Sequence, residues 1–164
     1  MSELIEKDME QEEDTQKDKY LTFLLEKDYY GIEIKYVTEI IGIQTITGVP
    51  GQAEYVKGII NLRGRIIPVV DVRLLFKKEE VAYNDRTCIV VVDIREVSIG
   101  LIVDSVSEVI SIPENDVVPP PQLNKGFQNK YVKGIGKVGN DVKLVLDCER
   151  ILDNDELESI SSVI

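Results

Sequence analysis

The chain has 164 residues, 43% of them hydrophobic, which suffices to bury a core in one domain or in two small lobes. Its formal net charge of −11 argues against nucleic acid and anionic membranes as partners, because affinity for both comes from Lys and Arg. No apolar stretch is long enough to span a bilayer, and the acidic first residues lack the apolar core of a signal peptide. We therefore expect a cytoplasmic protein without direct membrane insertion.

The N-terminal third combines a charged tail with short strands. Residues 1–18 carry many charges and few apolar groups, which predicts a disordered acidic tail, with a solvated helix as the alternative. Residues 20–25 and 29–34 read as two strands joined by a turn at 26–28. Residues 37–43 fit a helical turn or another strand, because the periodicity does not decide. A loop is predicted at 44–54, where Gly48, Pro50 and Gly51 occur.

The middle of the chain predicts a hairpin and then a second set of strands. Residues 55–76 read as two strands with a tight turn at 61–64, because Asn and Gly tolerate the left-handed backbone of such turns. Pro68 lacks an amide donor and is expected at a strand edge, a bulge or a strand start. After the polar segment 77–86, further strands are predicted at residues 87–94, 97–103, 106–112, 131–138 and 142–148. A Pro-rich loop covers 113–128, and 147–164 reads as a polar helix with one apolar side.

The two sets of strands resemble each other. The pentapeptide Tyr-Val-Lys-Gly-Ile at residues 55–59 recurs at 131–135, an offset of 76. Upstream, Gly31, Val37, Glu39 and Ile43 match Gly100, Val106, Glu108 and Ile112 at an offset of 69. Two ordered registers that differ by one loop length are typical of a duplicated unit. We therefore predict two small barrel-like β lobes, since closing a sheet removes the exposed edges of short strands.

The residue types of most active sites are missing or isolated. The chain contains no histidine, the commonest general base and zinc ligand. Cys88 and Cys148 lie in separate apolar runs, which favours buried free thiols over a metal or dithiol site. Asp71 and Asp147 match by duplication and precede Arg73 and Arg150, where helix capping or ion pairing explains them better than acid–base chemistry. We expect no enzyme, no metal and no cofactor.

Arg63 is the sharpest candidate for a partner contact. It lies in the predicted turn of a strongly acidic protein, where a guanidinium is well placed to bind a carboxylate. Pairing within the chain, for instance with Glu39, is an equally weighted interpretation, and the two roles are compatible.

Three segments carry a resemblance to a known family. VKGIINLRGRIIPVVDVR at residues 56–73 resembles the signature of the CheW-like domain, and GIEIKYVTEIIGI at 31–43 and GLIVDSVSEVI at 100–110 are similar to the same family. The resemblance covers residues 20–152. It implies a mainly β fold of two SH3-like five-stranded barrel lobes, with short helices and a C-terminal helix. The expected divisions are a tail at 1–18, a domain at 19–154 with lobes near 28–86 and 87–152 whose strands can be exchanged, and a helical tail at 155–164.

The resemblance also implies a function without chemistry. Such proteins are adaptors that couple the cytoplasmic tip of a methyl-accepting chemoreceptor to the regulatory domain of the chemotaxis histidine kinase. A free adaptor would be monomeric and recruited to membrane receptor arrays; a CheW-like scaffold for another histidine kinase pathway is the alternative. The positions that match receptor-coupling sites are Val37, Glu39, Gly58 and Arg63, with Ile89, Ile99 and Val106 as apolar groove candidates. A kinase contact is expected in the loop at 118–123, at Val118, Gln122 and Leu123.

Overall fold

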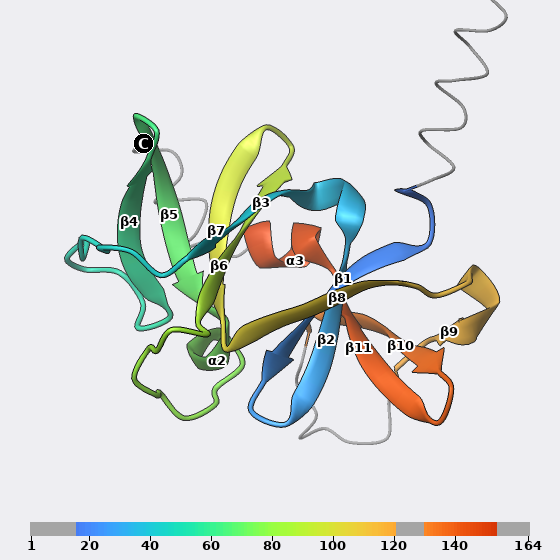
Figure 1. The fold of residues 1–164 in the computed structure, drawn as a ribbon. Helices are drawn as coiled ribbons and strands as arrows, with labels where there is room; N and C mark the ends of the chain where they lie inside the picture. The colour runs from blue at the N-terminus through green and yellow to red at the C-terminus, as the bar shows by residue number, and fades with distance from the viewer. Residues whose placement is uncertain (1–15, 121–129, 154–164) are drawn as a thin grey trace, which may run out of the picture.

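The computed structural model describes residues 16–120 and 130–153, which form the mainly β fold expected from the sequence (Figure 1). One sheet has the strand order β3-β6-β7-β5-β4, and we call it lobe 1. Its strands are β3 (Val37–Gly42), β6 (Cys88–Ile94), β7 (Val97–Val103), β5 (Arg65–Asp71) and β4 (Val56–Leu62). An isolated bridge between Thr47 and Ile59 extends the sheet beyond β4.

The other sheet has the order β8-β1-β2-β11-β10-β9, and we call it lobe 2. Its strands are β8 (Ser105–Ser111), β1 (Lys19–Leu25), β2 (Asp28–Glu33), β11 (Asp141–Leu146), β10 (Val132–Val138) and β9 (Val117–Val118). The helices are the 3-10 turns η1 (Ile34–Tyr36) and η2 (Glu114–Asp116) and the short α-helices α2 (Val72–Leu75) and α3 (Cys148–Leu152). Within the described ranges no helix has the length and apolar character needed to cross a bilayer.

The two lobes exchange their strands. Lobe 1 combines β3, β4 and β5 with the later hairpin β6–β7, whereas lobe 2 combines the first hairpin β1–β2 with β8 to β11. Of the lobes expected near 28–86 and 87–152, whose strands can be exchanged, the hairpins β1–β2 and β6–β7 are the elements that lie in the other lobe's sheet. Figure 1 shows β3 and β8 running across the middle of the molecule, where the chain passes from one lobe to the other.

The duplication is visible in the strand register. Phe23 pairs with Val106 in lobe 2, and Val92 pairs with Val37 in lobe 1, which are equivalent positions at the offset of 69. The β4–β5 and β10–β11 ladders each have a bulge, between Val56 and Gly58 and between Val132 and Gly134. Since β4 and β10 also share one burial pattern, the repeat extends to the side chains that face the core.

The helix caps repeat as well. The carboxylate of Asp71 accepts hydrogen bonds from the amides of Arg73 and Leu74, and that of Asp147 accepts from Glu149 and Arg150. A carboxylate at this position satisfies amides that have no partner inside the helix. The capping interpretation of these two acids is therefore confirmed.

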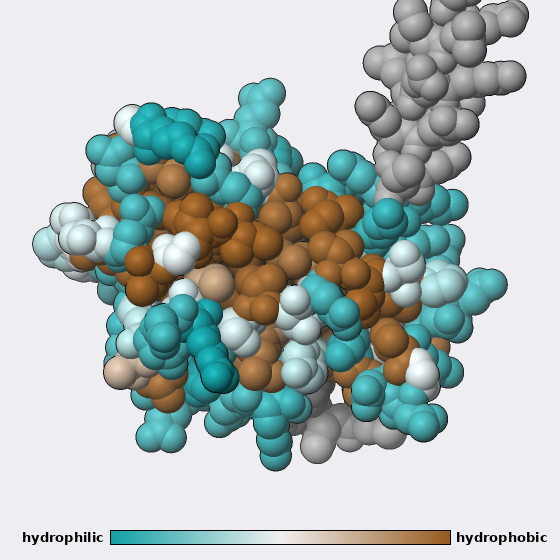
Figure 2. Space-filling view, viewed as in Figure 1, coloured by the Kyte–Doolittle hydropathy of each residue, from teal (hydrophilic) through white to brown (hydrophobic). Residues whose placement is uncertain are grey.

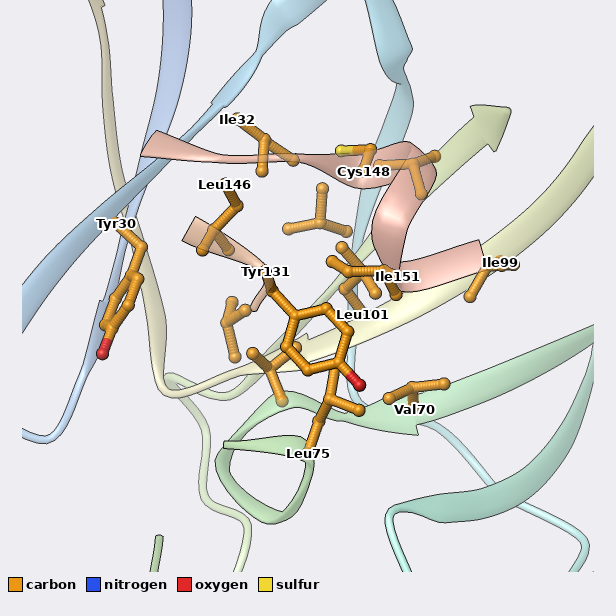
Figure 3. Packing of buried hydrophobic residues seen from close by; sticks show 14 of the residues in the cluster. Tyr30, Ile32, Val70, Leu75, Ile99, Leu101, Tyr131, Leu146, Cys148 and Ile151 are labelled. Atoms are coloured by element: carbon orange, nitrogen blue, oxygen red, sulfur yellow. The ribbon is translucent and has the colours of Figure 1, made fainter. Parts of the chain in front are cut away.

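The largest group of buried side chains lies between the lobes (Figure 3). It brings together residues of both sheets and of α3, and we call it the inter-lobe core; its labelled members are Tyr30, Ile32, Val70, Leu75, Ile99, Leu101, Tyr131, Leu146, Cys148 and Ile151. A smaller cluster around Ile60, Ile67 and Ile89 fills lobe 1, and Tyr20, Ile112 and Val145 fill lobe 2. Each fully buried Leu or Ile contributes about 1.5–3 kcal/mol, so the contact between the lobes stabilises the fold.

Several local predictions can be compared with these elements. Residues 37–42 are a strand, and Cys88 and Cys148 are free thiols. Pro68 lies in the middle of β5 rather than at its start, but it precedes Val69, where pairing with β7 begins. The predicted tail at 1–18 and helix at 147–164 fall mostly outside the described residues; of the latter, α3 is described.

Candidate protein-interaction surface

The strands β3 and β8 place apolar side chains beside the inter-lobe core. Each is an outer strand of its sheet, β3 next to β6 and β8 next to β1. Val37 and Ile40 pair with Val92 and Val90, which belong to the inter-lobe core. Because paired residues of antiparallel strands share one face, both side chains lie on the side of that core.

The equivalent side chains of β8 lie in the same way. Val106 and Val109 pair with Phe23 and Leu21, which also belong to the inter-lobe core. Ile40 is 44% exposed and Val109 is 51% exposed, so both extend the core to the surface. Val37, Ile40, Val106 and Val109 together form what we call the crossing-strand surface.

Figure 2 shows this arrangement from outside, as an apolar band across the face on which β3 and β8 pass between the lobes. Exposed apolar residues that continue a buried core are typical of protein contacts, whereas scattered ones carry no such implication. The exposed pair Ile40 and Val109 was not among the residues predicted from the sequence. The repeat could have identified them, because Ile40 and Val109 match each other at the offset of 69.

Arg63 pairs with Glu39 of β3, the neighbour of Ile40 in that strand. Its Nη1 and Nη2 atoms donate to the two carboxylate oxygens of Glu39 at 2.9 and 3.1 Å. Since β3 and β4 are the outer strands of the lobe 1 sheet, this pair joins its two edges. The alternative of internal pairing is therefore confirmed.

The backbone of the β4–β5 turn presents Arg63 outward. Arg63 and Gly64 have φ angles of 54° and 87°, as a two-residue hairpin turn requires, and the Gly64 amide donates to Asn61 Oδ1 at 2.8 Å. The Arg63 side chain is 77% exposed although it is paired. A guanidinium has five N–H donors, so part of it remains accessible to a carboxylate of a partner.

Gly58 supports the surface without forming part of it. Its φ is +147°, and a Cβ there would lie 2.0 Å from the carbonyl oxygen of Thr47. Thr47 and Ile59 exchange backbone hydrogen bonds of 2.9 Å, which bind the loop after β3 to β4. A side chain at Gly58 would displace that loop, so the residue is a structural requirement.

The prediction that Ile89 and Ile99 line a groove at the surface is wrong. Ile89 and Ile99 are both 0% exposed: Ile89 lies inside lobe 1, and Ile99 lies in the inter-lobe core. The strand β6 is apolar on both faces because one face fills the barrel and the other packs between the lobes. Val106 is half-buried and lies on the crossing-strand surface.

The predicted kinase-contact residues are only partly described. Val118 lies in β9 and pairs with Ile135 of β10. This bridge is the counterpart in lobe 2 of the bridge between Thr47 and Ile59 in lobe 1. The Val118 side chain is half-buried. Gln122 and Leu123 fall outside the described residues.

A second polar cluster joins the lobes at the α2 end. Asp104, between β7 and β8, accepts from Arg73 Nε at 2.7 Å, from Arg73 Nη2 at 2.5 Å and from the Glu26 amide at 2.8 Å. Burial favours a raised pKa of Asp104, but the hydrogen bonds from Arg73 and Glu26 outweigh it and hold the pKa below its ordinary value. The carboxylate is therefore an ion-pair partner.

Other buried ionisable groups are also used structurally. Asp71 is 2% exposed and accepts from the Tyr83 hydroxyl at 2.8 Å, besides capping α2. Burial and this hydrogen bond raise the pKa of Tyr83. Among the described residues no group of three His, Cys, Asp or Glu side chains could hold a metal ion.

Known proteins resemble this chain in sequence and in fold. The model of the CheW-like domain family matches residues 19–156. Chemotaxis protein CheW of Klebsiella aerogenes is 31% identical over 144 residues, covering 88% of this chain and 87% of the relative. Chemotaxis protein CheW of Treponema pallidum is 30% identical over 147 residues, covering 87% and 86%. The crystal structure of scaffolding protein TtCheW from Thermoanaerobacter tengcongensis has a TM-score of 0.78 and 34% identity, covering 85% of this chain and 94% of that one.

Proposed function

The chain belongs to the CheW-like domain family of chemotaxis scaffolds, and from this premise we propose that it couples chemoreceptors to the chemotaxis histidine kinase. In this role it binds the regulatory domain of the kinase and the cytoplasmic tip of a methyl-accepting receptor. It is a monomer when free and is recruited from the cytoplasm to receptor arrays. The observation that supports the proposal best is the crossing-strand surface, where Ile40 and Val109 continue the inter-lobe core to the outside.

The crossing-strand surface suits the apolar face of a receptor helix. A helix in such a site contacts its partner through side chains one turn apart, and it needs an apolar floor with polar groups at the rim. Val37, Ile40, Val106 and Val109 supply the floor, and Arg63 supplies a cation through its pair with Glu39, the neighbour of Ile40 in β3. The Arg63–Glu39 pair fixes the guanidinium, so a partner carboxylate meets a donor that is already oriented.

The kinase would bind elsewhere on the molecule, at β9. This short strand is the last of the lobe 2 sheet and carries the half-buried Val118. Separate sites allow receptor and kinase to be bound together. The adaptor then shifts the active fraction of the kinase only as far as its contacts differ between the receptor's states.

The test is a calorimetric titration with each partner from the same organism, using a soluble fragment of the receptor tip and the isolated kinase regulatory domain. Val109→Asp should weaken receptor binding by roughly tenfold or more, because it replaces an apolar contact with a charge. Kinase binding should be unchanged. Val142→Asp is the matched control, since Val142 is 60% exposed on β11 of the same lobe and lies outside the crossing-strand surface.

Equal receptor binding by Val109→Asp and the wild type would contradict the proposed receptor site. Absence of binding to the chemotaxis kinase, with both proteins folded, would contradict the coupling function. It would favour a scaffold for another histidine kinase pathway.

A further inference from the structure

Two ion pairs join the lobes at positions that the duplication makes equivalent to within one residue. Glu26, in the β1–β2 turn of lobe 2, binds Lys78 beyond α2 of lobe 1, with 3.1 Å between Oε2 and Nζ. Arg95, in the β6–β7 turn of lobe 1, binds Asp153 beyond α3, the helix that follows the last strand of lobe 2. Each pair therefore links a hairpin turn of one lobe to the helix end of the other.

The charges of the two pairs are inverted. Arg95 matches Glu26 at the offset of 69, and Asp153 matches Lys77, the neighbour of Lys78, at the offset of 76. The acid and the base have exchanged places, yet an ion pair exists in both. If the charges of these exposed turns had no function, we would not expect both residues of a pair to change sign together and still attract each other.

The two ends differ in how deeply their ion pairs are buried. At the α2 end Arg73 and Asp104 pair through two hydrogen bonds, and their side chains are only 11% and 22% exposed. At the α3 end the side chains of Arg95 and Asp153 are 53% and 56% exposed. Water screens the exposed pair more strongly, so it contributes less to holding the lobes together.

The residue that matches Asp104 in the repeat does not join the lobes. At the offset of 69 the counterpart of Asp104 is Lys35, which pairs at 3.4 Å with Glu33 two residues before it. Asp104, in contrast, also accepts the backbone amide of Glu26 in the turn of lobe 2. The buried polar contact between the lobes is therefore concentrated at the α2 end.

We propose that the lobes turn relative to each other about the Arg73–Asp104 contact, and that the Arg95–Asp153 pair is a latch that holds the α3 end closed. Opening the latch separates α3 from β7, while the α2 end stays in place. Because β3 belongs to lobe 1 and β8 to lobe 2, the same motion changes the spacing across the crossing-strand surface. Only this last consequence, control of receptor binding, rests on the proposed function.

Cys148 provides a native probe of the motion. It lies at the start of α3, is 1% exposed, and its thiol has a pKa raised to about 12 by burial. It reacts with an alkylating reagent only when that end opens, since the reactive form is the solvent-accessible thiolate. The chain has two cysteines, so Cys88→Ser leaves Cys148 as the single target.

The experiment measures the rate of Cys148 alkylation by iodoacetamide in the Cys88→Ser protein. Arg95→Gln and Asp153→Asn should each raise the rate by roughly two- to five-fold, the range expected for loss of an exposed ion pair. The double exchange Arg95→Asp with Asp153→Arg should return the rate to the starting value. Lys78→Gln is the matched control at the α2 end and should leave the rate unchanged.

The dependence of the alkylation rate on ionic strength and the stability of each variant distinguish local opening from global unfolding. The rate in the Cys88→Ser protein should rise with ionic strength, and that of Arg95→Gln should not. Urea unfolding, measured on every variant, gives the contribution of global unfolding to the rate. An unchanged rate in Arg95→Gln, an equal rise in Lys78→Gln, or rates that follow global stability alone would overturn the proposal. None of these results depends on receptor binding, so failure of the proposed function is distinguishable.

Discussion

Lobe 1 and lobe 2 have the same strand register and equivalent closing bridges, Thr47 with Ile59 and Val118 with Ile135, but they differ in the turn beside the closure. In lobe 1 Arg63 of the β4–β5 turn pairs with Glu39 of β3. In lobe 2 the matching positions are Gly139 and Glu108, which cannot form this ion pair because glycine has no side chain. Buried positions constrain both copies equally, because a change there costs packing energy in either lobe. The exposed turns carry no such constraint, so the difference in binding chemistry lies there.

The largest expected difference between the lobes is at their paired glycines, Gly58 and Gly134. A Cβ at Gly58 would lie 2.0 Å from a backbone oxygen at a φ of +147°, whereas a Cβ at Gly134 would lie 2.7 Å from the Val117 side chain and 3.2 Å from the nearest backbone oxygen. Gly58→Ala should cost about 3 kcal/mol or more, and Gly134→Ala about 1 kcal/mol, because a side chain can move and a bound backbone cannot. Urea unfolding of the two variants measures both costs. Equal losses of unfolding free energy would show that the backbone at Thr47 moves away from the new methyl group as easily as the Val117 side chain does.

The capping aspartates should show an intermediate difference. Asp71→Ala removes the α2 cap and also leaves the half-buried Tyr83 hydroxyl without its acceptor, so we expect a loss of about 2–3 kcal/mol. Asp147→Ala removes the cap of α3 and an exposed ion pair with Arg150, and it should cost about 1 kcal/mol. Thermal and urea unfolding give both values. Tyr83→Phe, which removes the hydroxyl together with its need for an acceptor, should reduce the difference between the two aspartate variants.

The smallest effect concerns acid stability. Burial favours a raised pKa of Asp104 and of Glu33, but the ion-pair hydrogen bonds from Arg73 and Lys133 outweigh it and lower both. A carboxyl group with a lowered pKa in the folded state adds stability at neutral pH, and this is lost as the pH falls through the folded value. Asp104→Asn and Glu33→Gln should each make the stability less pH-dependent below about pH 4, by less than about 1 kcal/mol.

Urea unfolding between pH 7 and pH 2 measures these slopes. The two carboxylates lie in separate ion pairs, so the effects in the double variant should add. A slope that either variant leaves unchanged would mean that its ion pair does not persist in solution.

The sequence predicts the local elements well, because their signals are local. The turn at Asn61 to Gly64, the hairpin around Arg95 and the caps at Asp71 and Asp147 each depend on a few adjacent residues. The offsets of 69 and 76 also predict the repeated unit, and the structure repeats its bulges and caps.

Which sheet each hairpin joins could not be predicted in the same way. The pairing of β1 with β8 and of β3 with β6 involves partners 46 or more positions apart, and the alternation of side chains is the same for either partner. Ile89 and Ile99 were mistaken for groove residues for a related reason. Their strands are nearly continuous apolar runs, a pattern of burial on both faces rather than exposure on one.

The strand exchange also has a consequence for how such a chain could arise. If the segment at 77–86 were cut, each half would hold a hairpin that completes the other half's sheet, as in a domain-swapped homodimer. Neither half buries its apolar strand faces alone. The molecule thus has the architecture of two intertwined subunits joined into one polypeptide. In one polypeptide the two copies of a turn can differ, as Arg63 opposite Glu39 and Gly139 opposite Glu108 do.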